Sequence, residues 1–311
     1  MRKTVFLFSA LLCSAPLCSA VMASVQARGS EARTLQQQVA ADPAGEVTIE
    51  NVAGSIQVLG WDRREVVATA EVHGADLALQ VDAQHGRTKV RISGYHRFWE
   101  KLLGQEQRSA QLTVYVPKTS QVDISAVSAT VDCTGITGAQ YLHSVSGRIH
   151  ADPASGDLSA SSVSGDIDLH GNGRSSRFDL RSVSGQVSLV HGAGDLQAST
   201  VSGAIAAALD AAHRVQLRTT SGDISISGSL ARGASVDANT LSGGVRVREQ
   251  APAGFSYALR SLSGGLDDCF GQATERDAAH GPGRNVSGTR GAGDAIIEIK
   301  TLSGDASICD R

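Results

Sequence analysis

Apolar and polar residues alternate in short runs along most of the chain, from Glu46 to the C-terminus. The runs are grouped around a recurring phrase, Ser/Thr-Val/Leu-Ser-Gly followed one residue later by Ile, Val or Leu in nearly every copy. Its central serines, taken as position 0, are Ser146, Ser164, Ser184, Ser202, Ser221, Ser242, Ser263 and Ser303. A degenerate copy is centred on Ser128, and successive serines lie 18 to 21 residues apart except for a last step of 40. Such a period predicts a solenoid, in which each unit buries its apolar face against its neighbours.

The apolar residues before and after each serine predict strands. Positions −6 and −4 are mostly apolar, and so are positions +3 and +5. A spacing of two is typical of a strand with one buried face, so each repeat carries two short strands that stack about 4.8 Å from those of the next repeat. The side chains expected to point inward are Val163, Ile167, Leu169, Leu180, Val183, Val187 and Leu217.

These strands define the predicted fold class. We expect an all-β protein, a single-stranded parallel β-solenoid with coils of 18–21 residues and a less regular N-terminal β cap. Right-handed winding, as in a right-handed β-helix, follows from the general crossover preference.

The phrase itself marks a corner, because the residue at −1 is out of step with the alternation before it. Glycine at +1 is expected because it can adopt positive φ. The corner glycines are Gly147, Gly165, Gly185, Gly203, Gly222, Gly243, Gly264 and Gly304. The hydroxyls at −2 and 0 should form ladders that bond to the backbone of neighbouring coils. Nucleophilic serines are disfavoured, since a catalyst needs one and not eight.

Four regions follow from the pattern. Residues 1–27 are predicted to be a signal peptide and 28–45 a flexible lead-in. Residues 46–120 form the β cap, and 121–311 form the repeats with an inserted loop at 270–293. In that loop Asn285-Val286-Ser287-Gly288 imitates the phrase, but Arg290 at +3 argues against a true coil.

The N-terminus predicts export. Arg2 and Lys3 precede an apolar stretch, with cleavage expected after Ala23 or Ala27. No later stretch approaches the roughly 18 apolar residues that span a bilayer. The net charge of −3 argues against a nucleic-acid partner. We therefore expect a protein of the periplasm or cell surface, or a secreted one.

Three cysteines follow the signal peptide. Cys133 occupies an inward +5 position and is expected to be buried. Cys269 and Cys309 each lie six residues after a motif serine. If 270–293 is an insertion, their coils are adjacent with Cα atoms about 5 Å apart, which a disulfide accepts. The bridge is expected to secure the last coil, taken as the open end of the stack.

The recurring phrase, preceded by Val114-Tyr115-Val116-Pro117, resembles the bacterial "putative-adhesin" family, a domain-of-unknown-function family of exported β-strand-repeat proteins. The resemblance covers roughly residues 46–309. It implies a β-solenoid with adhesin-like architecture, and it brings no activity and no catalytic residues.

The sequence contains no nucleophile elbow, HExxH pair, CxxC pair or phosphate loop. We therefore predict no catalytic residue, no cofactor and no metal, and a non-enzymatic envelope protein that binds or scaffolds an unknown protein or glycan. The alternative is a carbohydrate-active β-helix enzyme, for which the outward cluster Asp132, His150, Asp166 and Asp168 is the candidate site. A simpler explanation of this cluster is that its charges keep a stacked sheet soluble. Sugar-binding grooves usually also present exposed aromatic residues, and here Tyr141 is nearly the only outward one expected.

Overall fold

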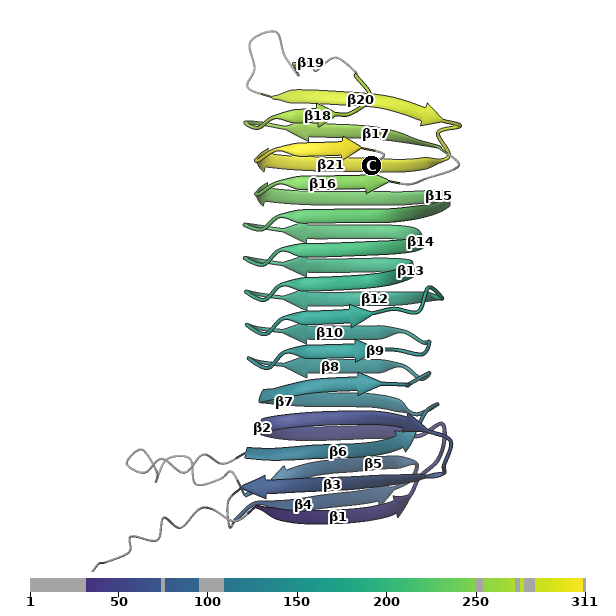
Figure 1. The fold of residues 1–311 in the computed structure, drawn as a ribbon, viewed down its shortest axis with the longest axis vertical. Coiled ribbons are helices and arrows are strands. Elements are labelled where there is room, and N and C mark those ends of the chain that lie inside the picture. Colours follow the sequence, from purple (N-terminus) through teal and green to yellow (C-terminus); the bar gives the residue numbers. More distant parts are fainter. Residues whose placement is uncertain are drawn as a thin grey trace, which may run out of the picture.

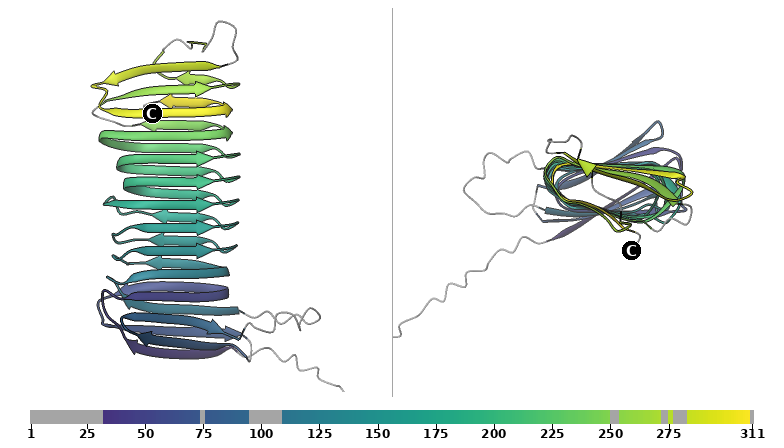
Figure 2. Two further views of the ribbon diagram at one scale, coloured as in Figure 1. Left: turned by 180° about the vertical axis from the view of Figure 1, so that it is seen from behind. Right: turned by 90° about the horizontal axis from the view of Figure 1, so that it is seen from above.

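The structure is a computed structural model that describes residues 32–73, 76–94, 109–249, 254–271, 275–276 and 283–309. Over these ranges the chain is all β, with strands β1–β22 linked by hydrogen bonds into one sheet. The sheet winds into a tall stack of coils (Figure 1). Seen from above, the stack is a flattened ring in which two sheet layers face each other (Figure 2).

The middle of the stack is the regular array that the repeats predict. Its strands are β7 (Gln121–Thr134), β8 (Gln140–Ser144), β9 (Ile149–Asp152), β10 (Leu158–Ser162), β11 (Ile167–His170), β12 (Ser175–Ser182), β13 (Val187–Thr200), β14 (Ile205–Thr219), β15 (Ile224–Ser242) and β16 (Val245–Glu249). Equivalent residues of successive coils are paired in parallel, so that Ala160 lies between Leu142 and Leu180. Inward aliphatic side chains therefore form continuous columns.

The N-terminal end contains β1 (Arg33–Ala40), β2 (Glu46–Trp61), β3 (Glu65–His73), β4 (Ala78–Gln84), β5 (Arg87–Ser93) and β6 (Ser109–Pro117). β2 is itself a coil that pairs in parallel with β7 on one side and with β5 and β6 on the other. Beyond them the pairing reverses, because β4 runs antiparallel to β5, β3 to β6, and β1 to β3. Part of the expected lead-in is thus a strand, and Leu35 and Val39 of β1 pack against the core. The expected signal peptide lies outside the described residues.

The C-terminal end contains β17 (Gly254–Ser261), β18 (Leu266–Asp268), β19 (Glu275–Arg276), β20 (Arg284–Gly291), β21 (Ala295–Ser303) and β22 (Ala306–Cys309). β21 pairs in parallel with both β15 and β17, and β22 with both β16 and β18. The last coil in the sequence therefore lies between the two coils that precede it, as the position of β21 in Figure 1 shows. The expectation that this coil is the open end of the stack is wrong.

The outermost long strand at this end is β20, which pairs antiparallel with β17 along its whole length and with the two-residue β19 on its other edge. It comes from the segment expected to be an inserted loop and contains the imitation of the phrase. Val286 is buried there and Arg290 is exposed. The imitation of the phrase is therefore part of an extended antiparallel strand and does not form a corner. Antiparallel strands thus close both ends, so the predicted parallel β-solenoid is confirmed for the array and is wrong at the ends of the stack. Right-handed winding stays a prediction.

The core of the array is aliphatic apart from Phe178, and the contacts between Phe, Tyr and Trp rings of the described ranges lie toward the two ends. At the C-terminal end the rings of Phe255, Tyr257 and Phe270 lie 5.6–6.0 Å apart between centroids. At the N-terminal end Trp61 and Tyr115 lie 5.2 Å apart. The three C-terminal rings pack against the apolar core near this end of the stack. Trp61 and Tyr115 are half-buried on the outer face of β2 and β6. Within the described ranges no helix is long and apolar enough to cross a membrane.

Candidate functional site

The phrase forms a corner in which the hydroxyl at −2 points inward and the serine at 0 points outward. The −2 oxygen accepts a hydrogen bond from the glycine N–H at +1, as in Gly165 N to Ser162 Oγ at 2.8 Å and Gly203 N to Thr200 Oγ1 at 3.1 Å. The outward serine donates to the carbonyl of the preceding coil, as Ser146 Oγ does to Val127 O at 3.1 Å. The structural role predicted for these hydroxyls is confirmed.

The corner glycines serve a different purpose from the one expected. Among the eight, only Gly243 has a positive φ, of 155°. The requirement is instead one of close approach between coils, because a Cβ on Gly165 would overlap the carbonyl oxygen of Gly147, and one on Gly185 would overlap that of Gly165. The stacked backbones leave no room for a methyl group at this column.

The residues at −1 form an exposed apolar ridge along the corners. Val163 is 48% exposed and Val183 is 44% exposed, so the expectation that they point inward is wrong. The inward direction predicted for the other five residues is confirmed, because each is at most 1% exposed: Ile167, Leu169, Leu180, Val187 and Leu217. The corner turns the chain over two outward residues, −1 and 0, before the inward glycine. The ridge consists of Val52, Val127, Val145, Val163, Val183, Val201, Leu241, Leu302 and Leu262, in stacking order.

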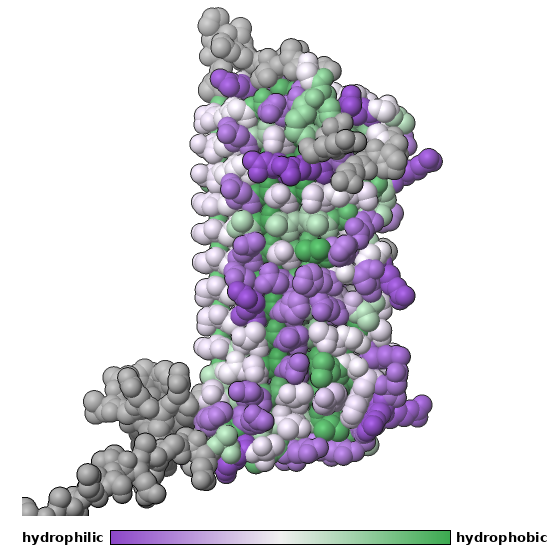
Figure 3. Space-filling view, viewed as in Figure 1, coloured by the Kyte–Doolittle hydropathy of each residue, from purple (hydrophilic) through white to green (hydrophobic). Residues whose placement is uncertain are grey.

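Backbone conformation does not explain why the ridge is apolar. Thr220 occupies the same place in its coil and is exposed, so a polar β-branched residue of the same shape fits there. Backbone bonds continue through the corners, as from Ser164 N to Val145 O and from Ser184 N to Val163 O, both 2.9 Å. The ridge therefore has the strand spacing, and its ten levels extend over roughly 40 Å. Along the edge where the corners lie, Figure 3 shows a regular succession of near-white residues of intermediate hydropathy, with hydrophobic green beside them.

The acidic residues at +2 are bound to the backbone of the next coil. Asp166 Oδ1 accepts from Gln186 N at 2.9 Å, and Asp223 Oδ1 accepts from Gly244 N at 2.8 Å. Asp305 Oδ1 accepts from Gly265 N at 2.7 Å. These carboxylates satisfy amide groups at the corner that have no strand partner.

The structure brings the expected surface cluster together on the outer face of three neighbouring strands. Asp132, His150 and Asp168 are register partners on β7, β9 and β11. Arg148 lies 3.6 Å from both Asp166 and Asp168. Two residues that the sequence reasoning missed, Asp152 and His170, complete the group, and their +6 positions one coil apart were the available signal.

The cysteines occupy the predicted places. Cys269 and Cys309 form a disulfide with Cα atoms 5.1 Å apart. Cys133 is a buried thiol that donates to Gln140 Oε1 at 3.2 Å, and burial raises its pKa to about 12. Such a thiol is inert at neutral pH, which fits a core residue.

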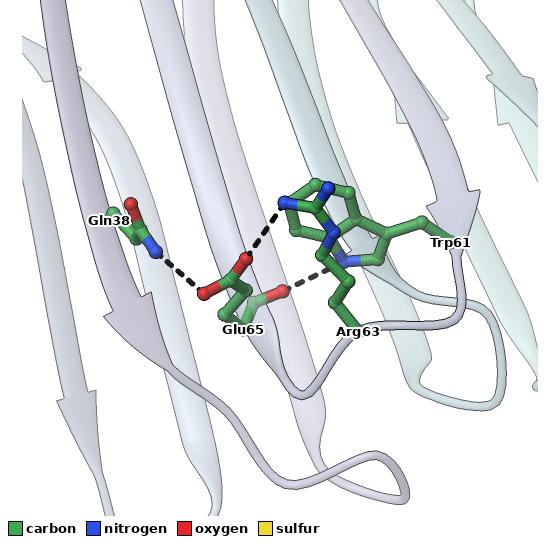
Figure 4. Close-up of polar contacts among 4 residues, drawn as sticks. All are labelled: Gln38, Trp61, Arg63 and Glu65. Carbon is green, nitrogen blue, oxygen red and sulfur yellow. Dashed lines mark hydrogen bonds and ion pairs between the residues drawn. The ribbon is translucent and has the colours of Figure 1, made fainter.

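Trp61 is an aromatic residue that a sugar could contact, but protein groups surround it (Figure 4). Its indole N–H donates to Glu65 O at 2.9 Å, and the guanidinium of Arg63 lies 4.9 Å from its ring centroid. Glu65 in turn pairs with Arg63 at 3.5 Å and accepts from Gln38 Nε2 at 2.6 Å. These contacts fasten the β2–β3 turn to β1, so the tryptophan face is not a free platform for a sugar.

Together the fold and the corners define a β-repeat protein whose repeated phrase is a stacking device and not a catalytic motif. The sequence profile of the Toastrack DUF4097 family matches residues 62–309, and the chain belongs to this family. The resemblance to adhesin-like proteins of unknown function is thereby confirmed. Among curated proteins none is significantly similar to the chain.

Several solved structures are similar to the chain at low sequence identity. One is described as a putative adhesin from Parabacteroides distasonis, with 10% identity, a TM-score of 0.49, and 90% of this chain and 98% of that chain covered. A putative lipid binding protein from the same organism has 12% identity and a TM-score of 0.44, with 88% and 96% covered. A putative adhesin from Bacteroides fragilis has 10% identity and a TM-score of 0.36, with 90% and 97% covered.

Proposed function

We propose that the chain is an exported, non-enzymatic binding protein that holds a protein partner along its corner ridge. The observation that carries the proposal is the ridge itself, a line of half-exposed Val and Leu side chains where Thr220 demonstrates that a polar residue fits. Apolar surface that is contiguous and not required by the fold is typical of a contact with another protein. The ridge is aliphatic and has a regular spacing, which suits an apolar groove in a protein more than a glycan, since sugars favour aromatic rings.

The expected leader supports export. Arg2 and Lys3 with the following apolar stretch indicate passage through a secretory pathway, and the Cys269–Cys309 disulfide suits an oxidising compartment. The periplasm, the cell surface and the medium remain the three candidate locations. Fractionation and the mass of the processed chain, expected to begin after residue 23 or 27, test this part.

The contacts of the acidic cluster favour binding over catalysis. Asp166 accepts from a backbone amide and lies beside Arg148, which also lies beside Asp168. These partners occupy carboxylate oxygens that a general acid for glycoside cleavage would need to present to the glycosidic oxygen. A hydrolysis screen on a glycan panel tests this directly, and turnover that disappears in Asp166→Asn and Asp168→Asn variants would overturn the non-enzymatic assignment.

Exchange of ridge valines for threonine tests the binding surface without changing its shape. The variant carries Val145→Thr, Val163→Thr, Val183→Thr and Val201→Thr, and its binding to intact envelopes is compared with that of the mature wild-type protein. We expect saturable binding that falls at least tenfold in the variant and disappears after protease treatment of the envelopes.

A matched control makes similar apolar-to-threonine exchanges away from the ridge, at Val190 and Ile296, both of which are accessible at the surface. Equal binding by ridge variant, control and wild type would overturn the assignment of the ridge. Binding that survives protease but not periodate oxidation would replace the protein partner by a glycan. Concentration-dependent self-association lost only in the ridge variant would replace it by a second copy of the chain.

A further inference from the structure

Three side chains with metal-ligating groups converge on the outer face of β9 and β11. His150 and Asp152 alternate on β9 and so point to the same side. The register Ile167↔Ile149 and Leu169↔Ala151 continues to place His170, the last residue of β11, beside Asp152 and diagonal to His150. Paired strands of the array hold all three backbones, so the grouping does not depend on a loop.

The distances between their ligand atoms fit one ion. His170 Nδ1 lies 3.2 Å from Asp152 Oδ1, and His150 Nε2 lies 3.6 Å from the same oxygen. One ligand atom from each residue lies within 4.8 Å of the others, and the two rings meet edge to face at 5.2 Å between centroids. Zinc bonds of about 2.0–2.1 Å place tetrahedral ligands about 3.4 Å apart, so rotations of exposed rings suffice to close the site.

The surrounding charge favours a cation. Asp132 lies on one side of His150 and Asp168 on the other, both as register partners. Asp166 and Asp168 both lie beside Arg148, which is the one cation among these neighbours in the described region. The carboxylates outnumber this guanidinium, so the local potential is negative when the histidines are neutral. The side chains of His150 and His170 are 30% and 55% exposed, which leaves the ion a path from solvent.

We propose that His150, Asp152 and His170 bind a divalent transition-metal ion of the zinc class on the outer face of β9 and β11. Two imidazole nitrogens and one carboxylate select a borderline-soft ion over calcium or magnesium, which prefer oxygen ligands alone. Three protein ligands leave at least one position for water or for a group from a partner. The proposal does not depend on the ridge or on a protein partner.

Calorimetric titration of the mature protein with zinc chloride, with no polyhistidine tag, tests the site. We expect one ion per chain, with affinity at least tenfold lower in each of the His150→Ala and His170→Ala variants. Binding should also weaken in acid, because an imidazole binds a metal ion only in its neutral form. Cobalt gives a second measurement, since its visible absorption bands should gain intensity with the wild type and not with the His170→Ala variant.

His191→Ala is the matched control, because His191 Nδ1 also lies 2.8 Å from a carboxylate, that of Asp210, but belongs to no group of three metal ligands in the described residues. It should bind zinc as the wild type does. Absence of binding by the wild type overturns the proposal, and so does binding that persists in a His150→Ala/His170→Ala double variant. An Asp152→Asn variant provides a further ligand test should circular dichroism show that a histidine variant misfolds.

Discussion

At the scale of single residues, the corner glycines are the least replaceable part of the repeat. Seven of the eight have no positive φ, so their identity comes from the space between coils and not from backbone conformation. The carbonyl of one corner glycine occupies the position that a Cβ of the next would need. Each coil therefore imposes the same requirement on its neighbour, and glycine recurs with the period of the stack.

Gly165→Ala should destabilise the protein by roughly 2–4 kcal/mol, because the added methyl group forces two coils apart. Gly244→Ala is the control, since the nearest atom to its Cβ is Asp223 Oδ1 at 3.6 Å. That variant should stay within about 0.5 kcal/mol of the wild type. Denaturant unfolding measures both changes, and equal midpoints for the two variants would contradict the close-approach explanation.

A buried carboxyl group makes stability depend on pH. Glu249 is 2% exposed, its Oε1 accepts from Leu230 N at 3.0 Å, and burial raises its pKa to about 7. The folded chain therefore holds a proton that the unfolded chain releases near pH 4.5. This contribution to stability is complete below about pH 4.5 and is lost as the pH rises through about 7.

Glu249→Gln should remove that dependence, because the amide accepts the same hydrogen bond without ionising. We expect the variant to be more stable than the wild type at pH 8 by about 1–3 kcal/mol and similar to it at pH 4.5. Unfolding curves at a series of pH values measure the difference. A gap between the two proteins that does not change with pH would rule out a buried proton on Glu249.

At the scale of elements, the coil of β21 and β22 is an internal layer although it follows the coil of β17 and β18 in the sequence. β21 and β22 have paired strands on both edges, so among the described strands β17 and β18 are joined to the array by the pairing of β21 and β22. The Cys269–Cys309 disulfide joins this coil to the one outside it across a separation of 40 residues. The disulfide thus links the outer coil of β17 and β18 to the inner coil of β21 and β22, and it does not secure an open end formed by the last coil.

Loss of the bridge in a Cys269→Ser/Cys309→Ser double variant should lower stability by about 2–4 kcal/mol, because the unfolded chain gains the freedom of a loop of this length. Peptide mapping without reduction should first find the two cysteines in one linked peptide. Adding a reductant should then lower the wild type to the level of the double variant and leave that variant unchanged. Free thiols at both positions in protein from an oxidising compartment would contradict the assignment.

At the scale of the whole molecule, the two ends of the stack differ from its middle, because antiparallel strands follow the parallel array at each end. A parallel array exposes a row of unpaired amide and carbonyl groups at its first and last coil, and such edges recruit other chains. Here β1 follows β3 and β20 follows β17, both antiparallel. At the C-terminal end the rings of Phe255 and Phe270 also pack against the apolar core. The long corner ridge is thus left as the continuous apolar feature of the described surface.

The sequence by itself determined the repeat, the two strands per coil and the inward columns, because strand alternation is a local property that reads directly from spacing. Ile167, Leu169 and Leu180 needed no tertiary knowledge, and neither did the pairing of Cys269 with Cys309. The outward direction of Val163 and Val183, in contrast, could be assigned only from the tertiary structure. The corner turns over two outward residues instead of one, and this reverses the inward–outward alternation at that point.

Only the tertiary structure decided the order of the last coils and the antiparallel strands at the two ends. Backbone hydrogen bonds are nearly independent of side-chain identity, so β21 could have stacked outside β17 with the same alternation. The convergence of His150 with His170 likewise depends on which strands become neighbours, because outward positions carry no burial pattern. Whether a side chain is buried is thus determined by the local sequence of this chain, whereas the identity of the neighbouring strand is determined by the assembled stack.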